Sequence, residues 1–232
     1  MVPGPVQMSW RLGQMLLDAL ALTNKDRPRV CVLETASGDS SLFYSMMYEA
    51  FNAAGCDVTE MKVFFQPSAD PIERLGGSDL VWVGGGSTAN LLALWRLHGV
   101  DVAMREAWED GVILGGVSAG SVCWHVGGTT DSFGPALKPV TNALGFLPYA
   151  NGVHYNSNEE RRPLMHQLMK DGTLPPLGYA TDDTVGIWYE GLEAASVVGD
   201  TAAVPDGPAA YRVEVVDGDV VETRVGVGER FN

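Results

Sequence analysis

The sequence predicts an α/β domain built on a parallel sheet that carries helices on both of its faces. Through its first half, the chain alternates short, apolar segments with longer segments of helical periodicity. Strands that are apolar on both sides are typical of a parallel sheet buried between helices. With 232 residues, 46% of them apolar, the chain fits one globular domain over residues 1–232 with a full core.

The elements of the first half follow from this alternation. Three short apolar runs and one alternating segment predict strands over residues 29–33, 79–83, 112–117 and 58–65. Apolar residues at helical spacing predict helices over residues 15–22, 40–54, 87–97 and 102–109. Gly55 and Gly99 stand where two of these helices should end, because glycine adopts the left-handed conformation of a helix C-cap.

The second half has a different character. Residues 127–155 are rich in Gly, Pro, Thr and Asn, so we expect irregular connections there. A helix is expected over residues 159–170. Strands are expected over 184–189 and 194–198, followed by a hairpin over 211–225 that turns at Asp217 and Gly218.

Charge and cysteine content exclude several classes of protein. The chain has 15 basic and 29 acidic residues, a net charge of −14, which argues against nucleic acids or anionic membranes as partners. Three cysteines, an odd number without a C-x-x-C pair, argue against a disulfide framework or a cysteine-rich zinc site. The apolar segment 15–22 is interrupted by Asp18 and follows no basic region, unlike a signal peptide or membrane span. A soluble, cytoplasmic protein is expected.

The distribution of glycine points to a site. Ten of the 28 glycines lie between Gly84 and Gly128. Among them, residues 116–120 read Gly-Val-Ser-Ala-Gly, the G-x-S-x-G pattern, between an expected strand and an expected helix. Such a turn raises the hydroxyl of Ser118 above the sheet edge and directs the N–H of Ala119 toward a developing oxyanion. The alternative is a plain strand-to-helix turn with a capping serine.

A second glycine cluster follows the strand expected over residues 79–83. Gly85 or Gly86 offers a second oxyanion donor, because backbone without a Cβ allows close approach of a substrate. The alternatives are a simple turn capped by Ser87 and, less favoured, a phosphate-binding loop. The phosphate loop is disfavoured because the glycines lack the G-x-G-x-x-G spacing and no Lys-Ser/Thr pair follows.

A serine nucleophile needs a base, and the chain has four histidines. His98 ends a helix, and His125 lies two turns beyond Ser118. His154 is favoured over His166, because a loop histidine can approach the serine whereas a mid-helix histidine is more often part of a core.

The acid that orients the histidine is less clearly marked. Asp131 lies between Ser118 and His154 in a Thr/Ser-rich loop and is the leading candidate. Its rivals are Asp182, Asp183 and Glu159. An aspartate in such a loop is also a common turn-former.

Together, these segments resemble peptidase family S51, the group of dipeptidase E and cyanophycinase. The resemblance covers roughly residues 28–215 and rests on segments 83–90, 116–120, 129–134, 154–155, 159–163 and 181–183. It implies a three-layer α/β/α sandwich with a mostly parallel sheet, related to class I glutamine amidotransferases. It further implies Ser118 as nucleophile, His154 as base and Asp131 as third member, with no metal or cofactor. The chain departs from the family by entering a helix after Met1–Pro5, where members open on a glycine-rich strand, and by a shorter segment after Ser118.

The function expected from these residues and the resemblance is hydrolysis of small peptides, including those with an N-terminal aspartate, by a monomer or homodimer. An aspartyl side chain needs a cationic partner, and Arg161 and Arg162 are the candidates. The alternative for both is a solvated helix start. Rival functions are an esterase or amidase with the same serine, or a non-catalytic binding protein on this scaffold.

Overall fold

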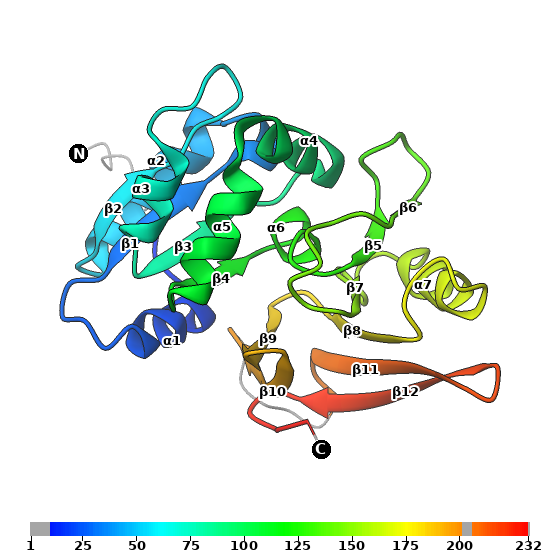
Figure 1. Cartoon of the computed structure of the whole chain (residues 1–232). Coiled ribbons are helices and arrows are strands. Elements are labelled where there is room, and N and C mark those ends of the chain that lie inside the picture. Colours follow the sequence, from blue (N-terminus) through cyan, green and yellow to red (C-terminus); the bar gives the residue numbers. More distant parts are fainter. Residues whose placement is uncertain (1–9, 201–205, 232) are drawn as a thin grey trace, which may run out of the picture.

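The computed structural model describes residues 10–200 and 206–231 (Figure 1). The opening residues Met1–Pro5 lie outside this range. The strands before Ser118 are β1 (Arg29–Leu33), β2 (Asp57–Glu60), β3 (Leu80–Val83) and β4 (Ile113–Gly116). The helices of this half are α1 (Gln14–Leu22), η1 (Thr35–Ser37), α2 (Ser41–Ala53), α3 (Pro71–Gly76), α4 (Thr88–His98) and α5 (Val100–Glu109).

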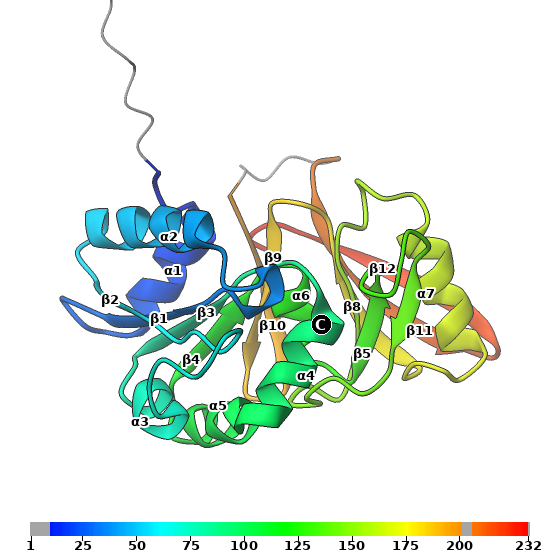
Figure 2. The same cartoon turned by 90° about the horizontal axis from the view of Figure 1, so that it is seen from above.

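The first half forms a parallel sheet between two layers of helices. Its strand order is β2-β1-β3-β4, and every neighbouring pair is parallel. Successive side chains of β1 face opposite sides: Val30 packs with the residues of α1 and α2, and Cys31 packs with those of α3, α4 and α5. Figure 2 shows these two helical layers on either side of the strands. The predicted α/β class with a sheet covered on both faces is confirmed.

One predicted strand is shorter than expected. The alternation over residues 58–65 predicted a strand of eight residues, but β2 ends at Glu60. Beyond it, the N–H groups of Val63 and Phe64 donate to the carboxylate of Asp39, each at 2.8 Å, rather than to a strand neighbour. A side-chain acceptor has therefore replaced the sheet as the partner of this backbone.

The second half contains more strands than its composition indicated. Its elements are α6 (Ala119–Val122), β5 (Gly127–Thr130), β6 (Lys138–Val140), β7 (Ala150–Gly152), α7 (Arg161–Lys170), β8 (Leu177–Thr181), β9 (Val185–Glu190), β10 (Glu193–Gly199), β11 (Ala209–Val216) and β12 (Asp219–Gly226). Six strands form a mixed sheet of order β12-β11-β8-β7-β5-β6, and β9 and β10 pair separately. The predicted hairpin is confirmed, with Asp217 and Gly218 both at positive φ.

Expecting only irregular structure over residues 127–155 was wrong, because β5, β6 and β7 lie there. Their glycines bring strands together more closely than larger residues could. A Cβ on Gly127 would lie 2.0 Å from the carbonyl oxygen of Val140, and one on Gly128 would lie 2.2 Å from that of Asn151. Short strands of this composition carry no apolar periodicity, so the sequence offered no signal for them.

The two main sheets meet around Ser118. Helix α6 lies between them in both views and contacts β3 and β4 on one side and β5 and β7 on the other (Figures 1 and 2). The three cysteines are buried and unpaired. Among the helices of the described residues, none combines the length and apolarity needed to cross a membrane.

The close contact between α6 and β3 predicts a steric requirement at Gly120. A Cβ there would lie 2.2 Å from the carbonyl oxygen of Val83, which is backbone and has little freedom to move. Gly120→Ala is expected to lower the free energy of unfolding by about 1–3 kcal/mol, as for other overpacked sites. Urea denaturation measures this change.

Gly76 provides the matched control, because a Cβ on it would meet no atom within 4 Å. Gly76→Ala should change the free energy of unfolding by less than about 0.5 kcal/mol. Equal effects of the two substitutions would contradict the steric argument.

Candidate active site

Ser118 lies on a strained turn between β4 and α6. Its backbone has φ 55° and ψ −113°, a conformation that costs a non-glycine residue energy and persists only where the surroundings impose it. The imposing contact is between Gly116 and Gly120, since a Cβ on Gly116 would lie 2.3 Å from the carbonyl oxygen of Gly120. The N–H of Val117 also donates to the carbonyl of Val83 at 3.1 Å. The turn predicted from the G-x-S-x-G pattern is therefore present.

His154 reaches Ser118 from the second sheet. It follows β7, has φ 55°, and its Nε2 lies 3.0 Å from Oγ of Ser118. Its other ring nitrogen, Nδ1, lies 2.6 Å from Oδ1 of Asp183. With the Nδ1 proton donated to the carboxylate, Nε2 is left as an acceptor for the serine hydroxyl. The arrangement can therefore move a proton from Ser118 to His154.

Asp183 follows β8 and is held by its own set of contacts. Its N–H donates to Oδ1 of Asn156 at 3.0 Å. A hydrogen bond with the Ser157 hydroxyl has the largest effect on the pKa of Asp183 and lowers it. Partial burial opposes this effect, and the contact with His154 and the charge of Arg161 lower the pKa further. Asp183 is thus kept as the anion that orients an imidazole.

The prediction that Asp131 orients His154 was wrong. Asp131 follows β5, and its side chain is 63% exposed with Oδ2 3.8 Å from Nη2 of Arg161. Both β5 and β8 are parallel neighbours of β7, so Asp131 and Asp183 each follow a strand beside the one that carries His154. Their contacts differ, because the carboxylate of Asp183 meets the imidazole while that of Asp131 faces Arg161. β8 was not predicted from the sequence, although Asp183 was one of the rivals to Asp131.

The two other candidate acids do not contact His154, whose Nδ1 faces Asp183. Asp182 is buried, and its carboxylate accepts from the N–H of Ala209 at 2.9 Å and from the hydroxyl of Tyr211 at 3.3 Å. It therefore ties β8 to β11 and does not face His154. Glu159 is an exposed residue just before α7.

The glycine loop after β3 lies against Ser118. A Cβ on Gly85 would lie 3.3 Å from Cβ of Ser118 and 3.9 Å from its Oγ. Within residues 10–200 and 206–231, the N–H groups of Gly85 and Gly86 meet no acceptor. Ala119 opens α6, so its N–H has no partner within the helix. Backbone donors thus remain available beside the serine.

Neighbouring backbone fixes this loop in place. The N–H of Gly84 donates to the carbonyl of Leu33 at 2.9 Å, and that of Ser87 donates to the carbonyl of Ala36 at 2.8 Å. Gly86 has φ 138°, and a Cβ on it would lie 2.3 Å from the same Ala36 oxygen. The loop is therefore held rigidly on the segment that follows β1.

The two predicted arginines have different environments. Arg161 is 5% exposed, and its Nη1 donates to the carbonyl of Thr129 at 2.9 Å. Burial lowers its pKa, whereas the charges of Asp131 and Asp183 raise it. Its Nε has no acceptor among the described atoms. Arg161 is thus a buried cation close enough to act on Asp183.

Arg162 belongs to a separate cluster centred on Glu222. Its Nη2 lies 2.5 Å from Oε2 of Glu222, and its guanidinium lies over the rings of Tyr155 and Tyr211. His166, the weighed alternative to His154, lies in the same cluster with Nε2 2.7 Å from Oε1 of Glu222. Neither residue is brought to Ser118.

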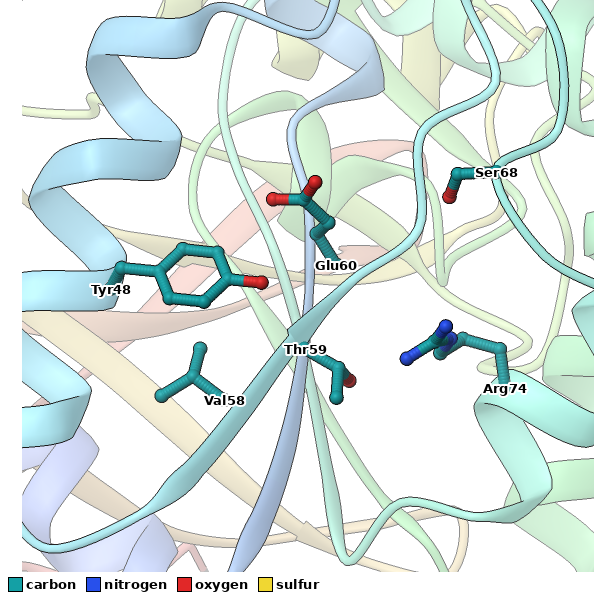
Figure 3. Close-up of a pocket in the computed structure, with 6 residues that line it drawn as sticks. All are labelled: Tyr48, Val58, Thr59, Glu60, Ser68 and Arg74. Atoms are coloured by element: carbon teal, nitrogen blue, oxygen red, sulfur yellow. The ribbon is translucent and has the colours of Figure 1, made fainter.

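A separate cavity of about 260 Å³ lies beside β2, at the opposite edge of the four-stranded sheet from β4. Figure 3 shows the residues that line it: Tyr48, Val58, Thr59, Glu60, Ser68 and Arg74. None of these residues takes part in the Ser118 arrangement. Over the part of the chain that the structure describes, no group of three His, Cys, Asp or Glu side chains is placed to hold a metal ion.

Comparison with known proteins identifies relatives over most of the chain. The family model described as Peptidase family S51 matches residues 4–197. A Bacillus subtilis (strain 168) protein named "Uncharacterized peptidase YgaJ" is 37% identical over 200 residues, covering 86% of this chain and 84% of the relative. "Peptidase E" of Streptomyces coelicolor is 26% identical over 159 residues, covering 65% of this chain and 64% of that protein.

Solved structures share the fold. The crystal structure of a peptidase from an acI-B1 Actinobacterium has a TM-score of 0.67 at 16% identity, covering 94% of this chain and 88% of that one. A putative peptidase E protein from Listeria monocytogenes EGD-e has a TM-score of 0.51 at 16% identity, covering 89% and 93%. At such identities the likeness supports the architecture alone.

The short contact between His154 and Asp183 predicts a spectroscopic signature. A proton held between a ring nitrogen and a carboxylate 2.6 Å away should resonate far downfield in the proton NMR spectrum. Asp183→Ala should abolish this resonance, because the acceptor is removed. The matched substitution Asp131→Ala should leave the resonance in place, and its loss in that variant alone would contradict the geometry.

Proposed function

The chain belongs to peptidase family S51 and is a serine-type peptidase, and we propose that Ser118, His154 and Asp183 form its catalytic triad. The observation that carries this proposal is the continuous pair of hydrogen bonds from Ser118 Oγ to His154 at 3.0 Å and from His154 to Asp183 at 2.6 Å. Nucleophile, base and orienting acid are recognised by such geometry and not by their order in the sequence.

In the proposed reaction, Oγ of Ser118 attacks the carbonyl carbon of a peptide bond while Nε2 of His154 accepts the hydroxyl proton. The resulting imidazolium is stabilised by the carboxylate of Asp183. His154 then protonates the leaving amine nitrogen as the carbon–nitrogen bond breaks, which leaves an ester on Ser118. Water, deprotonated by His154, attacks this ester and releases the carboxylic acid with the serine restored.

The tetrahedral intermediate carries a negative oxygen that needs donors. We assign this role to the N–H of Ala119 together with the N–H groups of Gly85 and Gly86. Their support is the position of Gly85 against Ser118 and the absence of other acceptors for these two glycine N–H groups within the described residues. The rigid attachment of the loop keeps the donors oriented before the reaction begins.

The proposed substrates are small peptides, including those with an acidic first residue. Arg161 is the candidate cation for a substrate carboxylate, because its charge already acts on Asp183 within the site. Its buried Nε, without an acceptor among the described atoms, is a donor that a substrate oxygen would satisfy. Arg162 is not proposed for this role, since its guanidinium is paired with the carboxylate of Glu222.

Substitution of the triad tests the catalytic assignment. Ser118→Ala should remove hydrolysis of a dipeptide library and reaction with a fluorophosphonate probe. Asp183→Asn should lower kcat by about 10³–10⁴-fold, since the amide favours the wrong imidazole tautomer. Asp131→Asn, the matched control, should retain most of the activity.

Undiminished hydrolysis by Ser118→Ala would overturn the triad. A larger loss in Asp131→Asn than in Asp183→Asn would overturn the assignment of the acid. Cleavage of p-nitrophenyl esters without cleavage of peptides would select the esterase alternative.

A separate experiment tests the role of Arg161. Arg161→Met should raise KM for Asp-X dipeptides by about tenfold or more, because a charge-assisted hydrogen bond is lost. KM for Ala-X dipeptides is the internal control and should change little. An equal increase for both substrate series would assign Arg161 a structural role instead.

A further inference from the structure

Glu34 places a buried carboxyl group beneath the glycine loop that follows β3. It is the first residue after β1 and is 2% exposed. Its carboxyl lies flat against Gly84: a Cβ on that glycine would be 2.1 Å from Oε2 and 2.7 Å from Oε1 of Glu34. The next residue, Gly85, is the one that contacts Ser118. One residue therefore separates this carboxyl from the backbone beside the nucleophile.

The surroundings of Glu34 do not stabilise a negative charge. From η1, the Ser37 hydroxyl reaches Oε2 at 3.4 Å, and from α2 the Tyr44 hydroxyl accepts the N–H of Glu34 rather than bonding the carboxyl. The charged neighbour is Asp39, whose carboxylate is held by two backbone N–H groups at 2.8 Å each. No cation faces the carboxyl among the described residues.

Burial is the main reason that the pKa of Glu34 is raised to about 7, and the charge of Asp39 adds to it while Ser37 opposes it. The carboxyl is consequently neutral in acid and becomes charged as the pH rises through neutrality. This change happens against the backbone that the proposed function uses as an oxyanion hole.

We propose that Glu34 is a positioning residue of the Gly84–Gly86 loop and that the loop supports acyl transfer only while this carboxyl is neutral. The inference rests on the proposed function, because it concerns the same oxyanion donors. An ionised carboxyl would place negative charge next to a developing oxyanion in a site of low dielectric constant. It would also draw nearby N–H groups toward itself, since a buried carboxylate requires hydrogen-bond donors.

Two groups then limit the reaction in opposite directions. His154 must be neutral to accept the serine proton, so activity is lost in acid. Glu34 must be protonated, so activity is lost again as the pH rises above about 7. The expected profile of kcat/KM is a bell whose alkaline limb belongs to Glu34.

The test compares kcat/KM from pH 5 to 9 for the wild type, Glu34→Gln and Glu60→Gln. Glutamine has the shape of the neutral glutamic acid, so Glu34→Gln should lose the alkaline limb. At pH 8.5 it should be about tenfold or more active than the wild type, since the neutral fraction falls tenfold per pH unit. Glu60 is the last residue of β2, and its carboxylate pairs with Lys62 at 2.6 Å rather than with the glycine loop. Glu60→Gln therefore removes a carboxylate that does not belong to the loop, and it should retain the wild-type profile.

Glu34→Met is a second variant that cannot ionise, and it should also lose the alkaline limb. The proposal is overturned if Glu34→Gln keeps that limb, or if both variants are less active than the wild type at every pH. Failure of the proposed function would be shown by a different result, namely full hydrolysis by Ser118→Ala. If Ser118→Ala is inactive while Glu34→Gln retains the wild-type profile, only the present inference fails.

Unfolding by urea provides a measurement that does not depend on catalysis. A carboxyl whose folded pKa is raised destabilises the protein as the pH increases beyond its unfolded pKa, and it has no such effect below that value. Glu34→Gln should therefore raise the urea midpoint relative to the wild type at pH 8 more than at pH 5. An equal effect at both pH values would overturn the titration of Glu34.

Discussion

The arrangement at Ser118 depends on direct contact between backbones that carry no side chain. Gly120 lies against the carbonyl of Val83, and Gly116 lies against the carbonyl of Gly120. These contacts hold the turn tightly enough to keep Ser118 at positive φ, which raises its hydroxyl above the end of β4. The glycine loop after β3 and the histidine after β7 then have a fixed nucleophile to approach. Larger side chains at the two glycines would displace all of these elements together.

The remainder of the site comes from the second sheet, in which β7 and β8 are parallel. β7 and β8 are neighbours, so the residues after them, His154 and Asp183, lie at a common edge. The N–H of Tyr155 donates to the carbonyl of Thr181 at 3.1 Å and fixes the segment that carries the histidine. The hydroxyl of Tyr155 in turn donates to Glu222 at 2.7 Å. Helix α6 links the two sheets, and the site lies where they meet.

Carboxyl groups around this site have opposite environments. The carboxylate of Asp183 accepts from Ser157 and His154 and lies near the charge of Arg161, and its pKa is lowered. Glu34 is buried beside the Ser37 hydroxyl and the Asp39 carboxylate, and its pKa is raised. The same functional group is therefore suited to orient a charged imidazole in one place and to remain neutral in the other. Burial and hydrogen-bond donors, rather than residue type, separate the two roles.

Local patterns in the chain were sufficient for the turn at Ser118, the glycine loop, most helices and the hairpin at Asp217, because each depends on residues a few positions apart. The choice between Asp131 and Asp183 was different in kind. β5 and β8 both pair with β7 in parallel, so each acid follows a strand beside that of His154. Only the three-dimensional contacts show that Asp183 meets the imidazole while Asp131 faces Arg161. Likewise, Arg162 is engaged by Glu222, which is 60 residues away along the chain. Side chains brought together across strands are selected by strand order and register, and these arise from packing of the whole chain rather than from any short segment of it.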